Sequence, residues 1–295
     1  MIRNTCSSAS FILRSRIGRA ASLVGLRILL SVVFCLSGPP FVCPQNGSWK
    51  SIEPGLHVGD FKVPHGSLTK APSLTIVKID PNLYALKLLC ASEYGRVRMT
   101  LRDWCQKHGL IGGINAGMYL EDGIKSVGYM KNFDHVNNSR INGSYKAILA
   151  FNRADPGVAP VRIIDLTCED FEGVRPKYQT FVQSIRMIGC RQENVWAKQS
   201  RRSSIAALGM DTNGNILFLF TEAPYSGHDF INLLLSLPIS IYNAMYLEGG
   251  PPANLYLSAS DAELERVGIY GTDPDEEPLR PALRPLPNIL GIARK

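Results

Sequence analysis

The sequence predicts a single α+β domain in which a mixed β-sheet forms the core and a few helices flank it. Three observations lead to this prediction. Short apolar or alternating runs bounded by Gly, Pro, Asn or Asp recur along the chain, as strands do. Only two segments carry both helical caps and helical periodicity. No boundary within residues 46–295 is long enough to be a linker, and no internal repeat is visible.

The elements are predicted in chain order from these local patterns. Helices are expected from the N-cap Thr100 to His108-Gly109, and over residues 229–237 with Ser226 as the cap. A hairpin turn is expected over residues 211–215, between two of the strands. Runs 74–79 and 84–90 are expected to pair, as are the last two strands, and residues 288–292 to dock as an edge strand after a loop at 273–287. The predicted strands are residues 74–79, 84–90, 110–114, 147–151, 161–166, 180–187, 204–210, 216–220, 245–247 and 254–257.

Charge and composition exclude some functions. The chain has 295 residues, 45% of them hydrophobic and 19% charged, which is typical of a globular protein with a real core. The formal net charge is +7, but five arginines lie in the first 38 residues, which contain no Asp or Glu. Without those five, the 32 basic residues fall to 27 against 25 acidic ones, a net charge of +2. We therefore expect no nucleic-acid partner.

Residues 1–45 are predicted to be an export signal and short leader. A basic region precedes the apolar run 28–36, which is too short to span a bilayer comfortably. Cleavage anywhere from about Gly38 to Gln45 and an uncleaved anchor both fit this pattern. We expect a periplasmic or secreted protein that touches a membrane only through this signal, if it is uncleaved.

The cysteines leave their pairing open. Cys90, Cys105, Cys168 and Cys190 lie beyond the leader, and four cysteines in an exported domain permit three pairings. Buried free thiols are an equally good interpretation of some of them. Their spacing shows no zinc pattern, so we expect neither a metal nor another cofactor.

Two stretches of similar design carry the candidate chemistry. In the first, an apolar run delivers the carboxylate of Glu248 to Gly249-Gly250, and a second strand-like run begins at Asn254. Paired glycines let the backbone approach a ligand closely. A tight turn with an exposed Glu is the alternative interpretation.

The second stretch ends a buried strand at Asn115 and then opens the backbone at Gly117. An Asn side chain can both donate to and accept from a sugar hydroxyl or a phosphate oxygen. The alternative is an Asn that bonds its own turn.

Other polar residues stand where partners or ligands are needed. Arg201 and Arg202 precede a buried strand, and arginine offers a fork that matches phosphate or carboxylate. A solvated charged loop is the alternative interpretation of this run, and Arg202 is the candidate for the site. Gln183 and Ser184 lie inside an apolar strand, where polar groups need partners. Glu222 and His228 flank a turn, and His228 is a candidate general acid or base, although a lone loop histidine is more often uninvolved.

Common catalytic motifs are absent from the sequence, which has no phosphate loop, His-Glu-x-x-His, Gly-x-Ser-x-Gly or dinucleotide fingerprint. The remaining set of one carboxylate, amides, arginines and open backbone suits a polar, partly anionic ligand. In order and spacing it resembles the phosphodiester glycosidase family, which includes the animal uncovering enzyme, and within that family the bacterial exported branch. The resemblance is carried by residues 113–119, 183–184, 202–209 and 246–250, and by 127–132, 135–138 and 223–230.

The resemblance implies hydrolysis of the glycosidic bond of sugar-1-phosphodiesters in envelope or extracellular glycans. It implies Glu248, Arg202 and Asn115 as catalytic residues. The substrate-binding residues would be Gly117, Gln183, Ser184, Glu222, His228, Gly249, Gly250 and Asn254. The family's usual Asp before Gly-Gly is Glu248 here, and Pro251-Pro252 follows. This departure favours a second hypothesis, a non-catalytic periplasmic glycan-binding module on the same fold. A hydrolase of ordinary glycosides with Glu222 as a second acid is a third.

Overall fold

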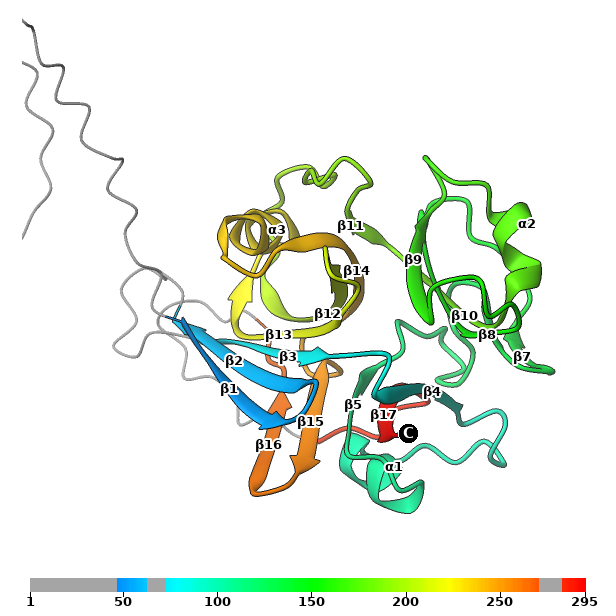
Figure 1. Cartoon of the computed structure of the whole chain (residues 1–295), viewed down its shortest axis with the longest axis horizontal. Coiled ribbons are helices and arrows are strands. Elements are labelled where there is room, and N and C mark those ends of the chain that lie inside the picture. Colours follow the sequence, from blue (N-terminus) through cyan, green and yellow to red (C-terminus); the bar gives the residue numbers. More distant parts are fainter. Residues whose placement is uncertain (1–46, 63–72, 271–282) are drawn as a thin grey trace, which may run out of the picture. The chain divides into compact units, whose positions relative to one another are not determined.

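A computed structural model describes residues 47–62, 73–270 and 283–295 (Figure 1). All of them belong to one compact unit of the chain, Pro44–Lys295. The predictions for the leader and for most of the loop at 273–287 fall on residues outside these ranges. No helix in the described ranges is long and apolar enough to cross a membrane.

The described residues form three antiparallel sheets. The first has seven strands in the order β1-β2-β3-β13-β12-β14-β11, and the others have five each, in the orders β7-β6-β10-β8-β9 and β16-β15-β5-β17-β4. The strands of the first sheet are β1 (Gly47–Glu53), β2 (Leu56–Lys62), β3 (Ser73–Ile79), β13 (Ile216–Tyr225), β12 (Ser203–Asp211), β14 (Ile241–Gly249) and β11 (Arg186–Ile188). Those of the second are β7 (His135–Asn138), β6 (Met130–Asn132), β10 (Tyr178–Ser184), β8 (Ala147–Arg153) and β9 (Val161–Asp165). Those of the third are β16 (Ala262–Val267), β15 (Asn254–Ala259), β5 (Gly112–Asn115), β17 (Asn288–Arg294) and β4 (Tyr84–Cys90).

The predicted fold class is wrong, because the structure is mostly β rather than α+β with a mixed sheet. Every strand pair in the described residues is antiparallel. A parallel pair needs a long crossover connection, usually a helix. The described α-helices are short: α1 (Leu101–Lys107), α2 (Phe171–Val174) and α3 (Gly227–Ser236), with a 3₁₀ turn at Arg175–Lys177.

The local signals for helices and turns are confirmed. The Thr100 hydroxyl accepts a hydrogen bond from the Asp103 N–H, and α1 ends at the C-cap His108. Ser226 caps α3 through the Asp229 N–H, although the helix begins two residues earlier than predicted. Asp211 closes the β12–β13 hairpin by accepting from the Asn213 and Asn215 N–H groups, each at 2.9 Å.

The long-range pairings differ from the predictions. The strands at 74–79 and 84–90 do not pair, because β3 lies between β2 and β13 while β4 pairs with β17. The last two predicted strands also separate, since β14 pairs with β12 and β15 with β5. β17 is no edge strand but lies between β5 and β4. The single predicted strand 180–187 is two strands in two sheets, because the chain leaves β10 at Ser184 and joins β14 through β11.

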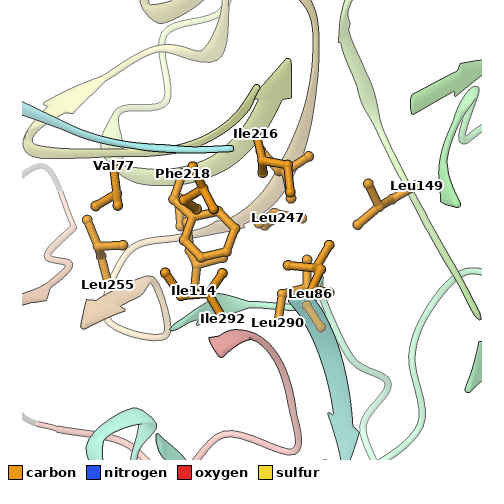
Figure 2. Packing of buried hydrophobic residues seen from close by; sticks show 14 of the residues in the cluster. Val77, Leu86, Ile114, Leu149, Ile216, Phe218, Leu247, Leu255, Leu290 and Ile292 are labelled. Carbon is orange, nitrogen blue, oxygen red and sulfur yellow. The ribbon is translucent and has the colours of Figure 1, made fainter. Parts of the chain in front are cut away.

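One apolar core joins the three sheets (Figure 2). Phe218 and Leu247 reach it from the seven-stranded sheet, Leu149 from the second sheet, and Ile114 and Leu290 from the third. The opposite face of the seven-stranded sheet packs against α3 in a second apolar cluster. Burying such side chains contributes about 1.5–3 kcal/mol each. β14 therefore packs against an apolar layer on each face, and this packing holds the strand in position up to its last residues.

The cysteines follow one of the open alternatives. Cys168 and Cys190 form a disulfide, and Cys90 and Cys105 are buried free thiols. The disulfide closes a loop with a sequence separation of 22 residues, for which loop-closure entropy gives about 3 kcal/mol. It ties the segment after β9 to the segment after β11.

Candidate active site

The candidate site lies at the end of β14, where Tyr246 and Glu248 line a cavity and Leu247 points into the main core. This is the alternation expected of a strand. The register against β12 shifts here, so that Ala206 faces Glu248 while Ala207 faces Tyr246, and Leu247 is the extra residue of a β-bulge. Bulges redirect side chains at the ends of strands. The bulge thus lies directly beside the carboxylate.

Both glycines after Glu248 are required by close contacts. A Cβ on Gly249 would lie 2.2 Å from the Tyr246 hydroxyl oxygen. Gly250 has a φ of +69°, and a Cβ there would lie 2.4 Å from the Tyr270 ring. Only glycine meets both demands without displacing an aromatic ring. The Gly-Gly step therefore lets two tyrosines pack directly against the backbone at the site.

Asn115 and Asn254 hold the loop that follows. The Asn115 amide donates to the Pro252 carbonyl at 2.7 Å, and its oxygen accepts from the Asn254 N–H at 2.7 Å. The Asn254 side chain also donates to Pro252 at 2.9 Å. Both side chains are almost fully buried. They fix the course of the backbone beside Glu248 and do not line the cavity.

A cavity of about 380 Å³ opens beside Glu248. Within the described ranges, Glu248 is the one carboxylate and Arg201 the one arginine or lysine in its lining. Four aromatic rings form much of the wall. The lining residues are Met118, Ile185, Trp196, Gln199, Arg201, Ser203, Ile205, Tyr225, Gly227, Tyr246, Glu248, Gly249, Pro252 and Tyr270.

Burial dominates the electrostatics of Glu248. Loss of solvent raises the pKa of its carboxyl group to about 7. Two effects oppose this rise: the carboxylate accepts a hydrogen bond from the Gly249 N–H at 3.0 Å, and Arg201 is positively charged. A carboxyl group with this pKa exchanges protons readily near neutral pH. Burial and the negative charge of Glu248 also raise the pKa values of Tyr119 and Tyr145.

Glu248 and Gly249 are the predicted site residues that line this cavity, and three of the others form ion pairs outside it. Arg202 is exposed and pairs with Asp229, with 3.7 Å between its Nη2 and the carboxylate. Glu222 pairs with Arg266 at 2.8 Å. His228 lies in the first turn of α3, and its Nδ1 lies 3.4 Å from the Asp229 carboxylate. None of the three is in the described lining of the cavity.

The other predicted residues occupy interior positions next to the site. Gln183 accepts from the Tyr129 and Asn142 N–H groups and donates to the carbonyls of Asn142 and Tyr145, so its side chain is fully used. The Ser184 hydroxyl donates to the Tyr246 carbonyl and so ties β10 to β14. Gly117 is buried with a φ of +117° and supplies the backbone turn before Met118.

A model of the phosphodiester glycosidase family matches residues 108–293, more than half of the chain. The chain belongs to the phosphodiester glycosidase family. The resemblance predicted from the sequence is thereby confirmed. No curated protein matches the chain.

Two solved structures are similar to this member of the family. The catalytic domain of zebrafish N-acetylglucosamine-1-phosphodiester alpha-N-acetylglucosaminidase, auto-inhibited by its pro-peptide, matches with a TM-score of 0.57 and 13% identity, over 84% of this chain and 88% of that one. A hypothetical protein from Synechocystis matches with a TM-score of 0.56 and 14% identity, over 84% of this chain and 64% of that one. At these identities the likeness shows a shared fold.

Several residues that line the cavity could not be assigned to it from the sequence. Trp196 and Arg201 lie in the irregular segment before β12, where spacing does not say which side chain points inward. Tyr270 reaches the site through an isolated bridge with Ser203. The sequence indicates Arg201 and Arg202 together as an anion-binding pair, but it does not say which of the two lines the cavity.

One cluster contains residue types that bind metals, but its two cysteines cannot act as metal ligands. Ligand atoms of Asp165, Cys168 and Cys190 lie within 4.8 Å of one another. The two sulfur atoms are joined in the disulfide, so neither is a thiolate ligand. The Asp165 carboxylate binds the Arg186 guanidinium with both oxygens at 2.9 Å. The cluster is a structural junction.

The raised pKa of Glu248 predicts a pH-dependent stability difference between the wild type and Glu248→Gln. Between about pH 4.5 and 7, the unfolded chain has lost this proton and the folded protein retains it, so rising pH destabilises the wild type by up to about 3 kcal/mol. The variant lacks this titration. Urea unfolding should find the variant more stable than the wild type by up to that amount at about pH 8, and the gap should largely close at about pH 4. Exposed Glu121→Gln is the control, and a gap independent of pH would contradict the assignment.

Proposed function

We propose that the protein hydrolyses the glycosidic bond of sugar-1-phosphodiesters, with Glu248 activating water and Arg201 binding the phosphate. The observation that carries this proposal is that one partly buried carboxylate and one arginine occur together in the described lining of the cavity. An ordinary glycosidase needs a second carboxyl group to protonate its leaving group. A phosphate ester departs without that help, so a single carboxylate is sufficient.

The proposed step uses the chain's own groups. Ionised Glu248 takes a proton from a water molecule as the water oxygen bonds to the anomeric carbon. The bond from that carbon to the phosphate oxygen breaks, and its electron pair leaves with the phosphate monoester. Arg201 offsets the charge that develops on this phosphate, which is the electrostatic part of the catalysis. The products are the free sugar and the phosphate monoester.

The walls of the cavity support a sugar ligand. Tyr246 and Trp196 pack against each other at a tilt of 42°, with 5.6 Å between their ring centroids, and Tyr225 and Tyr270 also line the cavity. Aromatic rings offer apolar faces to the C–H surfaces of a sugar, and tyrosine hydroxyls can bond its hydroxyl groups. A volume of about 380 Å³ lies within the usual range for small-molecule sites.

The substrate's location is a further part of this proposal. The basic and apolar pattern of residues 1–36 supports export. An exported enzyme of this family would act on phosphodiester-linked sugars of the envelope or of extracellular glycans.

Activity should depend on the ionised form of Glu248. We expect kcat/KM for release of sugar from a methyl sugar-1-phosphate diester to rise with pH, with an apparent pKa of about 7, and then to level off. Glu248→Gln should lose at least about a hundredfold in kcat. A rate that falls above neutral pH would instead assign the carboxyl group as a general acid.

The two neighbouring arginines form a matched pair for testing phosphate recognition. Arg201→Gln removes the cavity cation and should lower kcat/KM by about a hundredfold. Arg202→Gln removes the same charge from the exposed pair with Asp229 and should cost less than about threefold, as for a surface pair. The opposite order would support the assignment made from the sequence alone.

The same assays test the glycan-binding alternative, which is motivated by Glu248 in place of Asp and by Pro251-Pro252. Calorimetric binding of a methyl sugar-1-phosphate diester, without release of sugar at any pH, would favour a binding module. Slow release that Glu248→Gln abolishes would exclude it.

A further inference from the structure

A second hollow adjoins the Glu248 cavity at Trp196. Its volume is about 460 Å³, and it shares Ile185, Trp196 and Gln199 with the Glu248 cavity. We call it the lysine hollow. Its described lining consists of Ser144, Lys146, Ile185, Arg186, Val195, Trp196, Ala197, Lys198 and Gln199.

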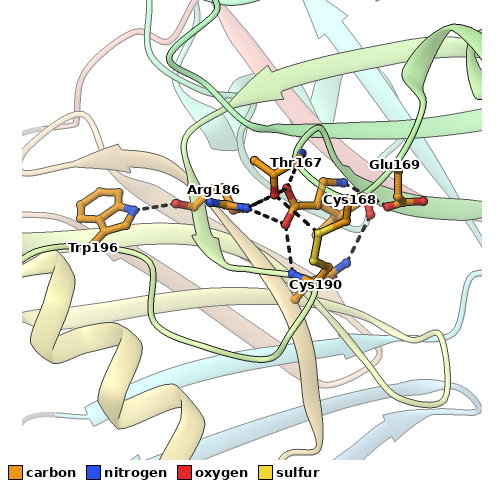
Figure 3. Close-up of polar contacts among 9 residues, drawn as sticks. Thr167, Cys168, Glu169, Arg186, Cys190 and Trp196 are labelled. Atoms are coloured by element: carbon orange, nitrogen blue, oxygen red, sulfur yellow. Dashed lines mark hydrogen bonds and ion pairs between the residues drawn. A yellow bond between two sulfur atoms is a disulfide. The ribbon is translucent and has the colours of Figure 1, made fainter.

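Trp196 is held firmly where the two cavities meet. Its indole N–H donates to the Arg186 carbonyl at 2.6 Å (Figure 3), and its ring packs on Tyr246 of the Glu248 cavity. A Cβ on Gly227 would lie 2.2 Å from the Trp196 ring, so the start of α3 packs closely against it. Trp196 is therefore a firmly held part of the wall that the two cavities share.

The charged side chains that line the lysine hollow are all positive. Its described lining includes Lys146, Arg186 and Lys198 and no carboxylate. Asp165 compensates Arg186, and Thr167 also accepts from this guanidinium (Figure 3). Neither lysine forms an ion pair within the described part of the chain. Two uncompensated positive charges therefore line this hollow.

One of these lysines, Lys198, is close in the chain to Arg201, the arginine that lines the Glu248 cavity. Arg201 is three residues after Lys198 in an irregular segment, so their Cα atoms are at most about 11 Å apart. This short separation, with the wall that the two cavities share at Trp196, lets a ligand whose phosphate contacts Arg201 extend toward Lys198. The lysine ammonium group is a point charge on a flexible side chain, so it can bind phosphate or carboxylate in more than one geometry.

We propose that the lysine hollow binds a second anionic group on the sugar unit next to the phosphodiester that is cleaved. This inference rests on the proposed function and deepens it, because it makes the preferred substrate a polyanionic glycan. The second anion is a phosphate or a carboxylate. Binding two anions of one molecule adds an intramolecular contact, which raises affinity through effective concentration.

The test compares three synthetic substrates that share the same sugar-1-phosphodiester bond to a second sugar. The second sugar is neutral, carries a phosphate monoester, or is a uronate. Lys146→Gln/Lys198→Gln removes the charges of the hollow. Lys50→Gln/Lys87→Gln removes two exposed lysines elsewhere and is the charge-matched control.

We expect the wild type and the control to prefer a substrate with a second anion over the neutral one in kcat/KM. Lys146→Gln/Lys198→Gln should lower that preference about tenfold, as expected for losing charge-assisted bonds. Preference for the phosphate or for the uronate identifies which anion is bound. An unchanged preference in the variant, or equal preference for all three substrates by the wild type, would overturn the inference.

A binding measurement separates this inference from the proposed function. Calorimetric titration of Glu248→Gln with the same three compounds needs no turnover. If the wild type cleaves nothing, tighter binding of the anionic compounds that the double lysine variant loses would still support the hollow. Equal binding of all three would overturn it, whether or not the enzyme is active.

Discussion

The partial burial of one carboxylate, that of Glu248, is the constraint on which the site depends. Glu248 is at the end of a strand whose two faces are both covered, by the joint core of three sheets and by the cluster under α3. Its position there raises its pKa to about 7, since a buried charge loses its hydration. The cost falls on folding stability at neutral pH, and the benefit is a carboxyl group that can take up and release a proton near pH 7.

The surrounding structure keeps that carboxylate in one place. Asn115 fixes the backbone at Pro252 and Asn254 from the neighbouring sheet, and the Ser184 hydroxyl holds the Tyr246 carbonyl from another strand. Groups that the sequence suggested as ligand contacts are thus hydrogen-bonded to the backbone. A preorganised site needs such supporting bonds because they position the reacting group before substrate arrives. Amides that orient the backbone are as necessary here as residues that touch a ligand.

Local features of the fold could be predicted from the sequence, and long-range ones could not. The caps at Thr100 and Ser226 and the turn at Asp211 depend on bonds spanning a few residues. The pairing of strands depends on a core assembled from segments that are distant in the sequence. For this reason the predictions of a mixed sheet and of a pair between β14 and β15 were wrong. The Glu248-Gly249-Gly250 stretch was found because its glycines leave a sequence signal. Arg201 and Arg202 differ in surroundings that only the folded segment determines, since one lines the cavity and the other pairs with Asp229.

The most direct test of the account is the titration of the Glu248 carboxyl group by ¹³C NMR, with labelled glutamate and with Glu248→Gln to assign the signal. Burial of the carboxyl group should set this midpoint at about pH 7. Arg201→Gln should move the midpoint higher, because the opposing positive charge is gone. A midpoint near the ordinary glutamate value of about 4.3, unaffected by Arg201→Gln, would contradict the account.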